Sequence, residues 1–173
     1  MPQPVRIDDD LREFLESGVS VIVGTRDARF LGEVLRAVGT RVVADGAEVV
    51  VYVPEATGAR TLANLADNGR VSLCCARIAD HVTIQVKGRA LAVEAASDED
   101  RARIDRYRRA LAENLAFIGL PLRLGLRLAH WPARAVRFAV DEVFLATPGP
   151  GAGAPLAAKE PPGDAGAPME SVA

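Results

Sequence analysis

Alternating apolar and polar positions, the period of a half-buried β-strand, recur in the first third of the chain. Residues 19–23 alternate valine with smaller residues, and a second apolar stretch covers residues 31–38. Two more stretches, residues 41–44 and 48–53, flank Asp45-Gly46. This dipeptide favours a tight hairpin because both of its residues accept a positive φ. The pattern therefore predicts antiparallel strands joined by short turns.

The strand pattern returns after a short interruption. Residues 71–76 form one apolar run, and residues 82–95 form a longer one. In the longer run the apolar residues change from even to odd positions at Gly88. A β-bulge at this glycine would keep one face buried and would bend the strand, as barrel closure requires. A last strand is predicted over residues 135–145.

Three segments with helical periodicity separate these strands. Residues 8–10 are aspartates that suit a helix N-terminus, and Gly18 ends that short helix. Thr57 is predicted to cap a second helix, which ends at Gly69. Ser97 begins a long third helix with a capping-box start. The strands and helices together predict an α+β, mainly β fold, an antiparallel barrel with flanking helices.

Two segments are less regular. Within the segment 120–132, residues 120–128 carry leucine at every second position, which favours a strand, but Arg123 and Arg127 stand at helical spacing. We favour a packed, irregular or helical connector there. From residue 148 onward glycine, alanine and proline dominate and no periodicity remains. The predicted organisation is a barrel domain over residues 1–147 and a flexible tail over residues 148–173.

Composition narrows the function classes. The formal net charge is −2, from 21 basic and 23 acidic side chains, so nucleic acid is not expected as a partner. No signal peptide or membrane-length apolar run is found, which favours a cytoplasmic protein without a membrane partner. Two adjacent cysteines, Cys74 and Cys75, give no disulfide framework or metal site.

Three places combine residues that could hold an anion or a polar ring. The turn over residues 52–61 joins a strand end to a helix start and carries Arg60, an arrangement that attracts phosphate. A capped helix with one solvated arginine is the alternative. Arg36, in an apolar strand, is either an edge-strand charge or an inward anion binder.

The third place is a polar row on the long strand. Thr83, Gln85 and Lys87 share a parity opposite to that of the apolar residues. Such a row is usually the solvated face of an antiparallel strand, but it could line a groove that recognises a polar ring. No catalytic or nucleotide-binding motif accompanies these residues, because GxGxxG, P-loop and HExxH sequences are absent.

The order of these elements resembles a known family. The similarity spans residues 8–151 and rests on five pieces in sequence: Arg36-Ala37-Val38-Gly39, Asp45-Gly46 before residues 49–52, residues 65–73, residues 85–90 and residues 143–151. Together they resemble the pyridoxamine 5′-phosphate oxidase-like FMN-binding split barrel. The resemblance implies an antiparallel six-stranded split β-barrel that forms a homodimer, with FMN in a groove between the two subunits.

The resemblance also implies roles for particular residues. In such proteins basic residues of the second strand and of the hairpin-to-helix turn bind the phosphate, and a polar residue of the long strand contacts the flavin. The matching cofactor-binding candidates are Arg36, Tyr52, Val53, Thr57, Arg60, Thr61, Thr83, Gln85 and Lys87. The family often has Ser-Arg-Lys in the turn, whereas this chain has Ala59-Arg60-Thr61 and so carries one positive charge fewer.

The activity implied is that of an FMN-dependent oxidoreductase acting with a small-molecule substrate or electron donor. The flavin supplies the chemistry in such enzymes, so no general base has to be found in the sequence. The alternatives are a non-enzymatic dimer that binds flavin, haem or another small ligand, and a structural dimer without a ligand.

Overall fold

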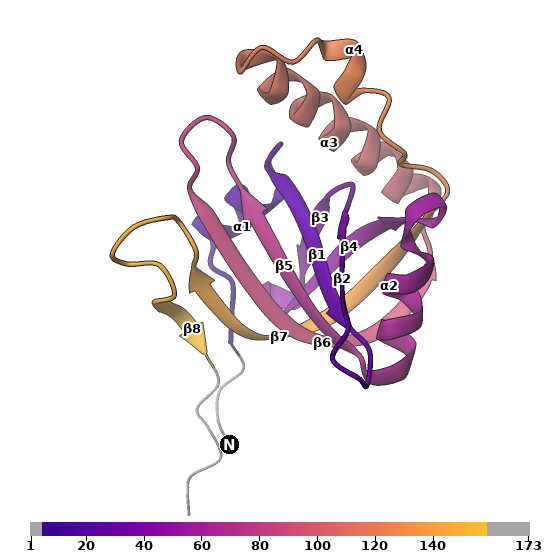
Figure 1. The fold of residues 1–173 in the computed structure, drawn as a ribbon, viewed down its shortest axis with the longest axis vertical. Helices are drawn as coiled ribbons and strands as arrows, with labels where there is room; N and C mark the ends of the chain where they lie inside the picture. The colour runs from indigo at the N-terminus through magenta and orange to yellow at the C-terminus, as the bar shows by residue number, and fades with distance from the viewer. Residues whose placement is uncertain (1–4, 159–173) are drawn as a thin grey trace, which may run out of the picture.

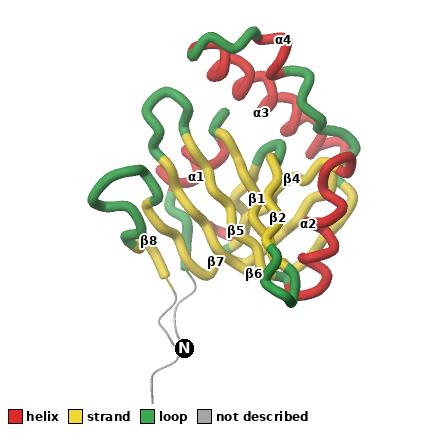
Figure 2. The backbone as a smooth tube through the Cα atoms, in the orientation of Figure 1, coloured by secondary structure: helices red, strands yellow, loops and turns green. Residues whose placement is uncertain are grey.

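The computed structural model describes residues 5–158 (Figures 1 and 2). Its helices are α1 (Asp9–Glu16), α2 (Glu55–Asn68), α3 (Asp98–Phe117) and α4 (Leu122–Gly125), with a 3-10 turn at Ala44–Gly46. Its strands are β1 (Ser20–Arg26), β2 (Gly32–Arg36), β3 (Thr40–Val43), β4 (Glu48–Pro54), β5 (Arg70–Ala76), β6 (Thr83–Ala95), β7 (Ala133–Leu145) and β8 (Pro155–Ala158). The α+β, mainly β class predicted from the sequence is confirmed.

The sheet closes on itself through the segment that contains β2 and β3. Its hydrogen-bonded order is β2-β1-β5-β6-β7-β4-β3, and every pair is antiparallel. Ala37 donates to the Val21 carbonyl over 3.0 Å, and Val38 donates to the Tyr52 carbonyl over 2.9 Å. β2 and β3 thus act as one bent strand that joins the two edges. The barrel therefore has six strand positions, and β8 pairs with β7 outside this path.

The glycine predicted to bend the long strand does so. The register between β6 and β7 shifts between Lys87 and Gly88, and a second shift follows near Ala90. A Cβ atom at Gly88 would overlap the Ala139 carbonyl oxygen and would lie 2.7 Å from the Phe138 ring. Only glycine allows β7 to approach this closely, so the bulge and the barrel curvature depend on it.

The barrel core consists mainly of valine, with α3 packed across one end (Figure 1). Ile104, Tyr107 and Leu111 form the buried stripe of this helix. The Tyr107 hydroxyl donates to the Val19 carbonyl over 2.8 Å, and Asn114 donates to the Gly18 carbonyl over 2.9 Å. These bonds anchor α3 to the start of β1.

The helix boundaries agree with the sequence patterns at α1 and α3 but not at the start of α2. Asp8 accepts the Leu11 N–H at the start of α1, and Ser97 forms the expected capping box at α3. The prediction that Thr57 caps α2 is wrong, since Pro54 holds the N-cap position and no side chain caps the helix. A strand end that runs directly into the helix leaves no residue free for that task.

The two less regular segments also form short elements. The connector over residues 120–132 contains α4, which agrees with the helical alternative. Within the segment expected to be a flexible tail, β8 pairs with β7 and aligns Ala157 with Val143. The prediction of a structureless tail is therefore wrong for residues 155–158, because β7 extends beyond β4 and offers a free edge there. Residues 159–173 lie outside the described part of the chain.

Candidate functional site

One face of the sheet formed by β2, β1, β5 and β6 points outward, and no helix crosses in front of it in Figure 1. We call it the outer sheet face. The register aligns Arg36 with Ile22, and it aligns Cys74 with both Ile22 and Gln85. Directly opposed residues point to the same side of a sheet, so these four side chains form one row. The neighbouring Val21 points the other way, into the core.

A second row runs beside the first. It contains Val34, Gly24, Ser72 and Lys87, which are aligned across the same four strands. Val34 is 68% exposed although it lies in the middle of a strand. The exposure of this valine shows that no other described part of the chain covers the outer sheet face at β2.

A hollow of about 310 Å³ lies along this second row. Its walls include Gly24, Ser72, Lys87 and Gly88 together with Arg26, Arg70, Asp141 and Glu142. We call it the Lys87 hollow. Gln85 donates to the Ser72 hydroxyl over 3.1 Å, and the Lys87 ammonium lies 4.4 Å from the centre of the Phe144 ring. Two of the three predicted polar side chains of β6, Gln85 and Lys87, are thereby held in place on the outer sheet face.

A second hollow, of about 350 Å³, lies between the β2 edge, the first turn of α2 and the connector before β7. We call it the Arg36 hollow. It is lined by Glu33, Val34, Leu35, Arg36, Thr57, Leu128 and Ala129. The structure thus brings together Arg36 and Thr57, two of the predicted residues, from elements that are 18 residues apart along the chain.

The guanidinium of Arg36 is oriented but not neutralised. Its Nη1 donates to the Ser20 hydroxyl over 2.9 Å. Among the residues that the structure describes, Arg36 forms no ion pair within 4.0 Å. Its fixed charge and the N–H groups that do not face Ser20 are available to an anion, for which arginine provides a planar donor fork.

Arg60 stands beside the same hollow but is already paired. Its Nε lies 3.7 Å from the Glu33 carboxylate, which lines the Arg36 hollow. Glu33 lies on β2 and Arg60 on α2, so the pair links the two walls. Arg60 therefore contributes its charge to the rim, while Glu33 reduces the positive potential there.

The first turn of α2 completes this wall. The helix starts at Glu55, and no side chain accepts its first N–H groups. The Glu55 N–H instead donates to the Pro132 carbonyl over 2.9 Å, and the Glu55 carboxylate pairs with Arg134 over 2.8 Å. Thr57, which does not cap the helix, lines the Arg36 hollow. The positive end of a helix dipole thus reaches the same place as Arg36.

Three predicted residues of this region are buried. Tyr52, Val53 and Thr61 have relative exposures of 1%, 0% and 0%. The Tyr52 hydroxyl donates to Asp100 over 2.6 Å, and Thr61 Oγ1 has no hydrogen-bond partner in the described residues. Tyr52 and Val53 are buried because β4 is covered on both sides, and Thr61 lies on the buried face of α2. A ligand in the Arg36 hollow has no access to the side chains of these residues.

The contact between Tyr52 and Asp100 links two elements of the fold. Burial and the hydrogen bond to Asp100 raise the pKa of the Tyr52 phenol well above its usual range. Burial raises the pKa of the Asp100 carboxyl, but hydrogen bonds from Tyr52 and Ser97 outweigh it, so the net shift is downward. The ionised carboxylate joins β4 to the start of α3.

The remaining predicted residue, Thr83, is occupied locally. Its hydroxyl donates to the His81 carbonyl over 2.8 Å, and its N–H donates to the Thr147 hydroxyl over 2.9 Å. It shares the parity of Gln85 but serves the turn before β6. Thr83 therefore supports the end of the outer sheet face rather than either hollow.

Several residues of the two hollows could not be identified from the sequence. Glu33, Leu128 and Ala129 stand in no motif, and Ser72, within the matched piece 65–73, was not singled out; the strand register and the path of the connector bring them to the site. To predict which residues are aligned across four strands, one must know which strands pair and in which register, and a single sequence does not give this information. No cluster of three or more metal-ligating side chains occurs within residues 5–158. None of the helices in that range is long and apolar enough to cross a membrane.

The barrel and its flanking helices define an α+β split-barrel protein. The chain belongs to the pyridoxamine 5′-phosphate oxidase family, whose model matches residues 7–147. The resemblance found in the sequence is thereby confirmed at the level of family. No curated protein was found with significant sequence similarity to this chain.

Solved structures support the fold. HupZ of Group A Streptococcus matches with a TM-score of 0.52 and 16% identity, covering 85% of this chain and 99% of HupZ. A candidate pyridoxamine 5′-phosphate oxidase from Lactobacillus delbrueckii matches with a TM-score of 0.51 and 16% identity, covering 80% of this chain and 93% of that chain. At these identities the similarity establishes the fold alone.

Proposed function

We propose that the chain is an FMN-binding flavoprotein that acts as a homodimeric oxidoreductase on a small molecule. One observation supports this more than any other: Arg36, free of ion pairs among the described residues, lines a hollow of about 350 Å³ together with Thr57 from the first turn of α2, a helix that no side chain caps. A phosphate monoester matches this donor set in charge and in hydrogen bonding.

The residues fit the phosphate group of FMN in the following way. The Arg36 fork supplies charge and two parallel donors, while its bond to Ser20 fixes the direction of the side chain. The Thr57 hydroxyl and the first N–H groups of α2 add neutral donors. Arg60 adds positive potential at the rim of the hollow. Its effect is smaller than that of an unpaired arginine, because the Glu33 carboxylate lies 3.7 Å away.

A planar ring system fits the outer sheet face next to this hollow. Gly24 and Ser72 are small and leave the strands accessible, and the Gln85 amide offers a donor and an acceptor to a ring edge. Bound flavin would supply the hydride chemistry. The chain's own residues would hold the ring, shield one of its faces and tune it by hydrogen bonds from Gln85 and Lys87.

A homodimer follows from the same face. The outer sheet face exposes Val34 and half-exposes Ile22 and Cys74, whereas a stable monomer normally covers or charges such positions. A second copy placed there would enclose a ligand between two barrels. The cytoplasm remains our proposal for the compartment.

A second candidate function is non-enzymatic binding of flavin, haem or another planar anion. The observation that favours it is the Glu33–Arg60 pair, which leaves Arg36 as the main cation of the hollow. A ligand with a singly charged carboxylate demands less positive charge than a phosphate dianion. The two candidates differ in their ligand and in whether the bound group turns over.

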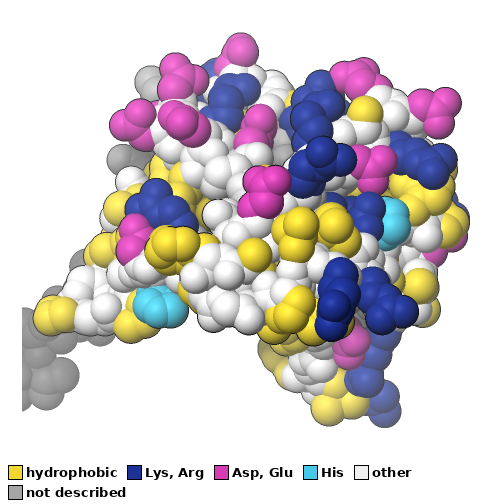
Figure 3. Space-filling model, turned by 90° about the horizontal axis from the view of Figure 1, so that it is seen from above, with side chains coloured by type: hydrophobic (Ala, Val, Ile, Leu, Met, Phe, Trp, Pro, Cys, Tyr) yellow, Lys and Arg dark blue, Asp and Glu magenta, His cyan; other side chains and the backbone are white. Residues whose placement is uncertain are grey.

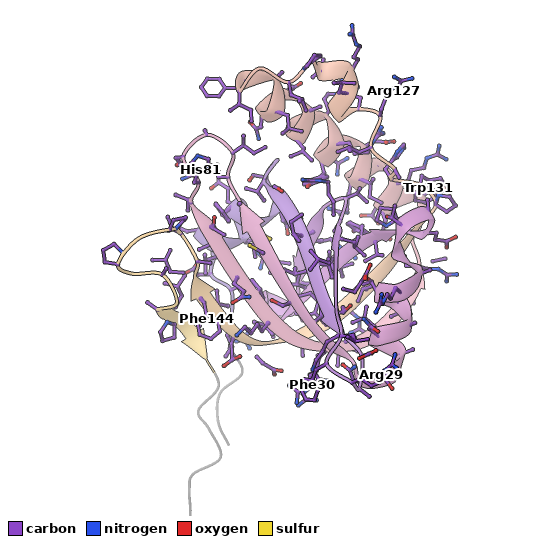
Figure 4. All side chains as sticks on the ribbon, viewed as in Figure 1. Arg29, Phe30, His81, Arg127, Trp131 and Phe144 are labelled. Carbon is purple, nitrogen blue, oxygen red and sulfur yellow. The ribbon has the colours of Figure 1, made fainter. Side chains whose placement is uncertain are left out.

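Titration with FMN and with riboflavin tests the proposed phosphate site, since the two ligands differ only in the phosphate. We expect FMN to bind at least tenfold more tightly than riboflavin, and Arg36→Ala to remove most of this difference, as loss of a charged hydrogen bond does. Arg29→Ala is the control, because Arg29 lies in the exposed β1–β2 turn (Figure 4), pairs with Asp27 and is not among the residues that line the hollow. Equal affinity for both flavins would contradict the assignment.

Anaerobic reduction separates an enzyme from a binder. Bleaching of the bound flavin by NADH, NADPH or a reduced deazaflavin supports an oxidoreductase. A flavin that stays oxidised with every donor, or a haem spectrum after reconstitution in place of flavin binding, supports the second candidate. Light scattering of the same sample gives the mass of the assembly, and a monomeric mass would contradict the dimer.

A further inference from the structure

The end of the molecule formed by α3 and α4 exposes a cluster of large apolar side chains. Phe117 is 80% exposed, and Ile118, Leu120, Leu122, Leu124 and Leu126 are between 37% and 59% exposed. Single exposed leucines are common on soluble proteins, but six large apolar residues within ten positions form a continuous segment. We call this set the α3–α4 apolar cluster.

The charge around this cluster is mostly positive. Between residues 106 and 130 the chain has five arginines and a single carboxylate, Glu113, although the whole chain has a net charge of −2. Arg123 and Arg127 stand within and directly after the cluster, and neither forms an ion pair in the described part of the chain. This end of the molecule therefore has an excess of positive charge, although the whole chain has a small net negative charge.

The cluster is held as a fixed surface. Gly125 is buried against α3, where a Cβ atom would lie 2.9 Å from that of Ala112. The Arg108 guanidinium bonds the Leu126 carbonyl and also pairs with Asp105 over 3.1 Å. α4 is thus packed on α3, and the apolar side chains are presented outward rather than folded into the barrel. Figure 3 looks onto this end, where yellow side chains lie next to dark blue ones.

A second copy of the chain is a poor occupant for this surface. An isologous contact would bring Arg123 and Arg127 towards the same arginines of the other copy, and no carboxylate occurs between residues 114 and 140 to pair with them. An acyl-chain surface with anionic headgroups satisfies both features. Apolar side chains enter the interface, and arginines extend along it to the headgroups.

We propose that the α3–α4 apolar cluster docks the protein on an anionic lipid surface. Phe117, Ile118 and Leu122 would enter the boundary between headgroups and acyl chains, with Arg123 and Arg127 on the headgroups. This differs from our sequence-based expectation of no membrane partner, which rested on the overall charge and the absence of a long apolar run. The proposal does not depend on the identity of the ligand at Arg36.

Flotation of the full-length protein with vesicles tests this docking. We expect binding to vesicles of phosphatidylcholine with phosphatidylglycerol, little binding to phosphatidylcholine alone, and release by salt. This comparison uses the unaltered protein. Absence of binding to the anionic vesicles, or equal binding to both compositions, would overturn the proposal.

Two variants locate the contact. Phe117→Ser with Ile118→Ser, and Arg123→Gln with Arg127→Gln, should each weaken vesicle binding at least fivefold. Phe30→Ser is the matched control, because Phe30 is 76% exposed at the opposite end of the molecule from Arg127 (Figure 4). Undiminished binding of both double variants overturns the assignment. A second result would also overturn it: the unaltered protein does not bind vesicles, and the Phe117→Ser with Ile118→Ser variant has a monomeric mass where the unaltered protein has a dimeric one. The cluster would then contact a second copy of the chain.

Discussion

The Arg60 Nε atom lies 3.7 Å from the Glu33 carboxylate, and this pair spans the rim of the Arg36 hollow between α2 and β2. It brings a negative charge to the wall of a site whose other polar groups favour an anion. The charge balance of the hollow is therefore set by three residues, Glu33, Arg36 and Arg60, rather than by the arginines alone.

Removal of this carboxylate should strengthen phosphate binding. Glu33→Gln keeps the size of the side chain but releases Arg60, so we expect FMN affinity to rise about fivefold while riboflavin affinity stays unchanged. Fluorescence titration of both flavins measures the two constants. Glu13→Gln, at an exposed carboxylate of α1, serves as the control and should change neither. A decrease in FMN affinity for Glu33→Gln would show that Glu33 positions Arg60 rather than competing with it.

Tyr52 should affect stability and not ligand binding. Tyr52→Phe removes the 2.6 Å bond to Asp100 and leaves a mostly buried carboxylate with one partner fewer. We expect the free energy of unfolding to fall by about 1–3 kcal/mol, the usual cost of an unsatisfied buried group. Urea unfolding measures the loss, and FMN titration should give the affinity of the unaltered protein. A large loss of FMN affinity in a folded Tyr52→Phe protein would show that Tyr52 contributes to ligand binding.

The same contact predicts a pH dependence of stability. The pKa of Asp100 is lower in the folded protein than its ordinary value of 3.8, because the bonds from Tyr52 and Ser97 outweigh burial. A carboxyl group with a lowered pKa stabilises the fold fully above its unfolded value and loses that contribution as the pH falls through the folded value. We therefore expect the contribution of Asp100 to be intact at pH 6, to decline once the pH falls below about 4, and to vanish only below the lowered pKa of the folded state.

Asp100→Asn tests this dependence. The difference in unfolding free energy between the unaltered protein and Asp100→Asn should be largest near neutral pH and should shrink as the pH drops below about 4, because Asp100 is protonated first in the unfolded chain and, at lower pH, in the folded protein. Urea unfolding between pH 3 and pH 7 measures it. Asp9→Asn is the control, because Asp9 is fully exposed on α1. A difference that stays constant over this range would show that the Asp100 charge does not contribute.

Gly88 should tolerate no side chain. In Gly88→Ala the new methyl group would overlap the Ala139 carbonyl oxygen and press on Phe138. Because the obstacle includes backbone of the neighbouring strand, β6 and β7 must separate, and we expect a loss of at least about 2 kcal/mol. Gly32→Ala is the control, since nothing lies within 4 Å of its added atom. Thermal unfolding of both variants compares them, and equal stability would contradict the close approach of the two strands.

The fold was predictable to a large extent because its determinants are local. The alternation of apolar residues, the parity change at Gly88 and the capping box at Ser97 each reflect backbone geometry over a few residues. The start of α2 was misjudged, since Pro54 belongs to a strand and to a helix cap at once. The strand β8 was missed because it depends on the free edge of β7, a feature far away in the sequence.

The candidate site was predictable only in fragments. The sequence pointed to Arg36, Arg60 and Gln85 as separate polar features, and the resemblance to the family joined them. It also assigned Tyr52 and Thr61 to the ligand, although both are buried. The continuous apolar run over residues 49–53 is typical of a strand covered on both faces, so the burial of Tyr52 agrees with the sequence pattern, whereas the burial of Thr61 depends on how α2 packs.

By itself, the sequence of this protein determined the strands, the hairpin at Asp45-Gly46, the bulge and the long capped helix, since these follow from interactions between residues near in the chain. Only the tertiary structure decided the contents of the Arg36 hollow and the exposure of the α3–α4 apolar cluster. Glu33 meets Arg60, and Arg36 meets Thr57, only after the barrel closes. The register of strands and the packing of helices set these distances, and neither is encoded in a short stretch of residues.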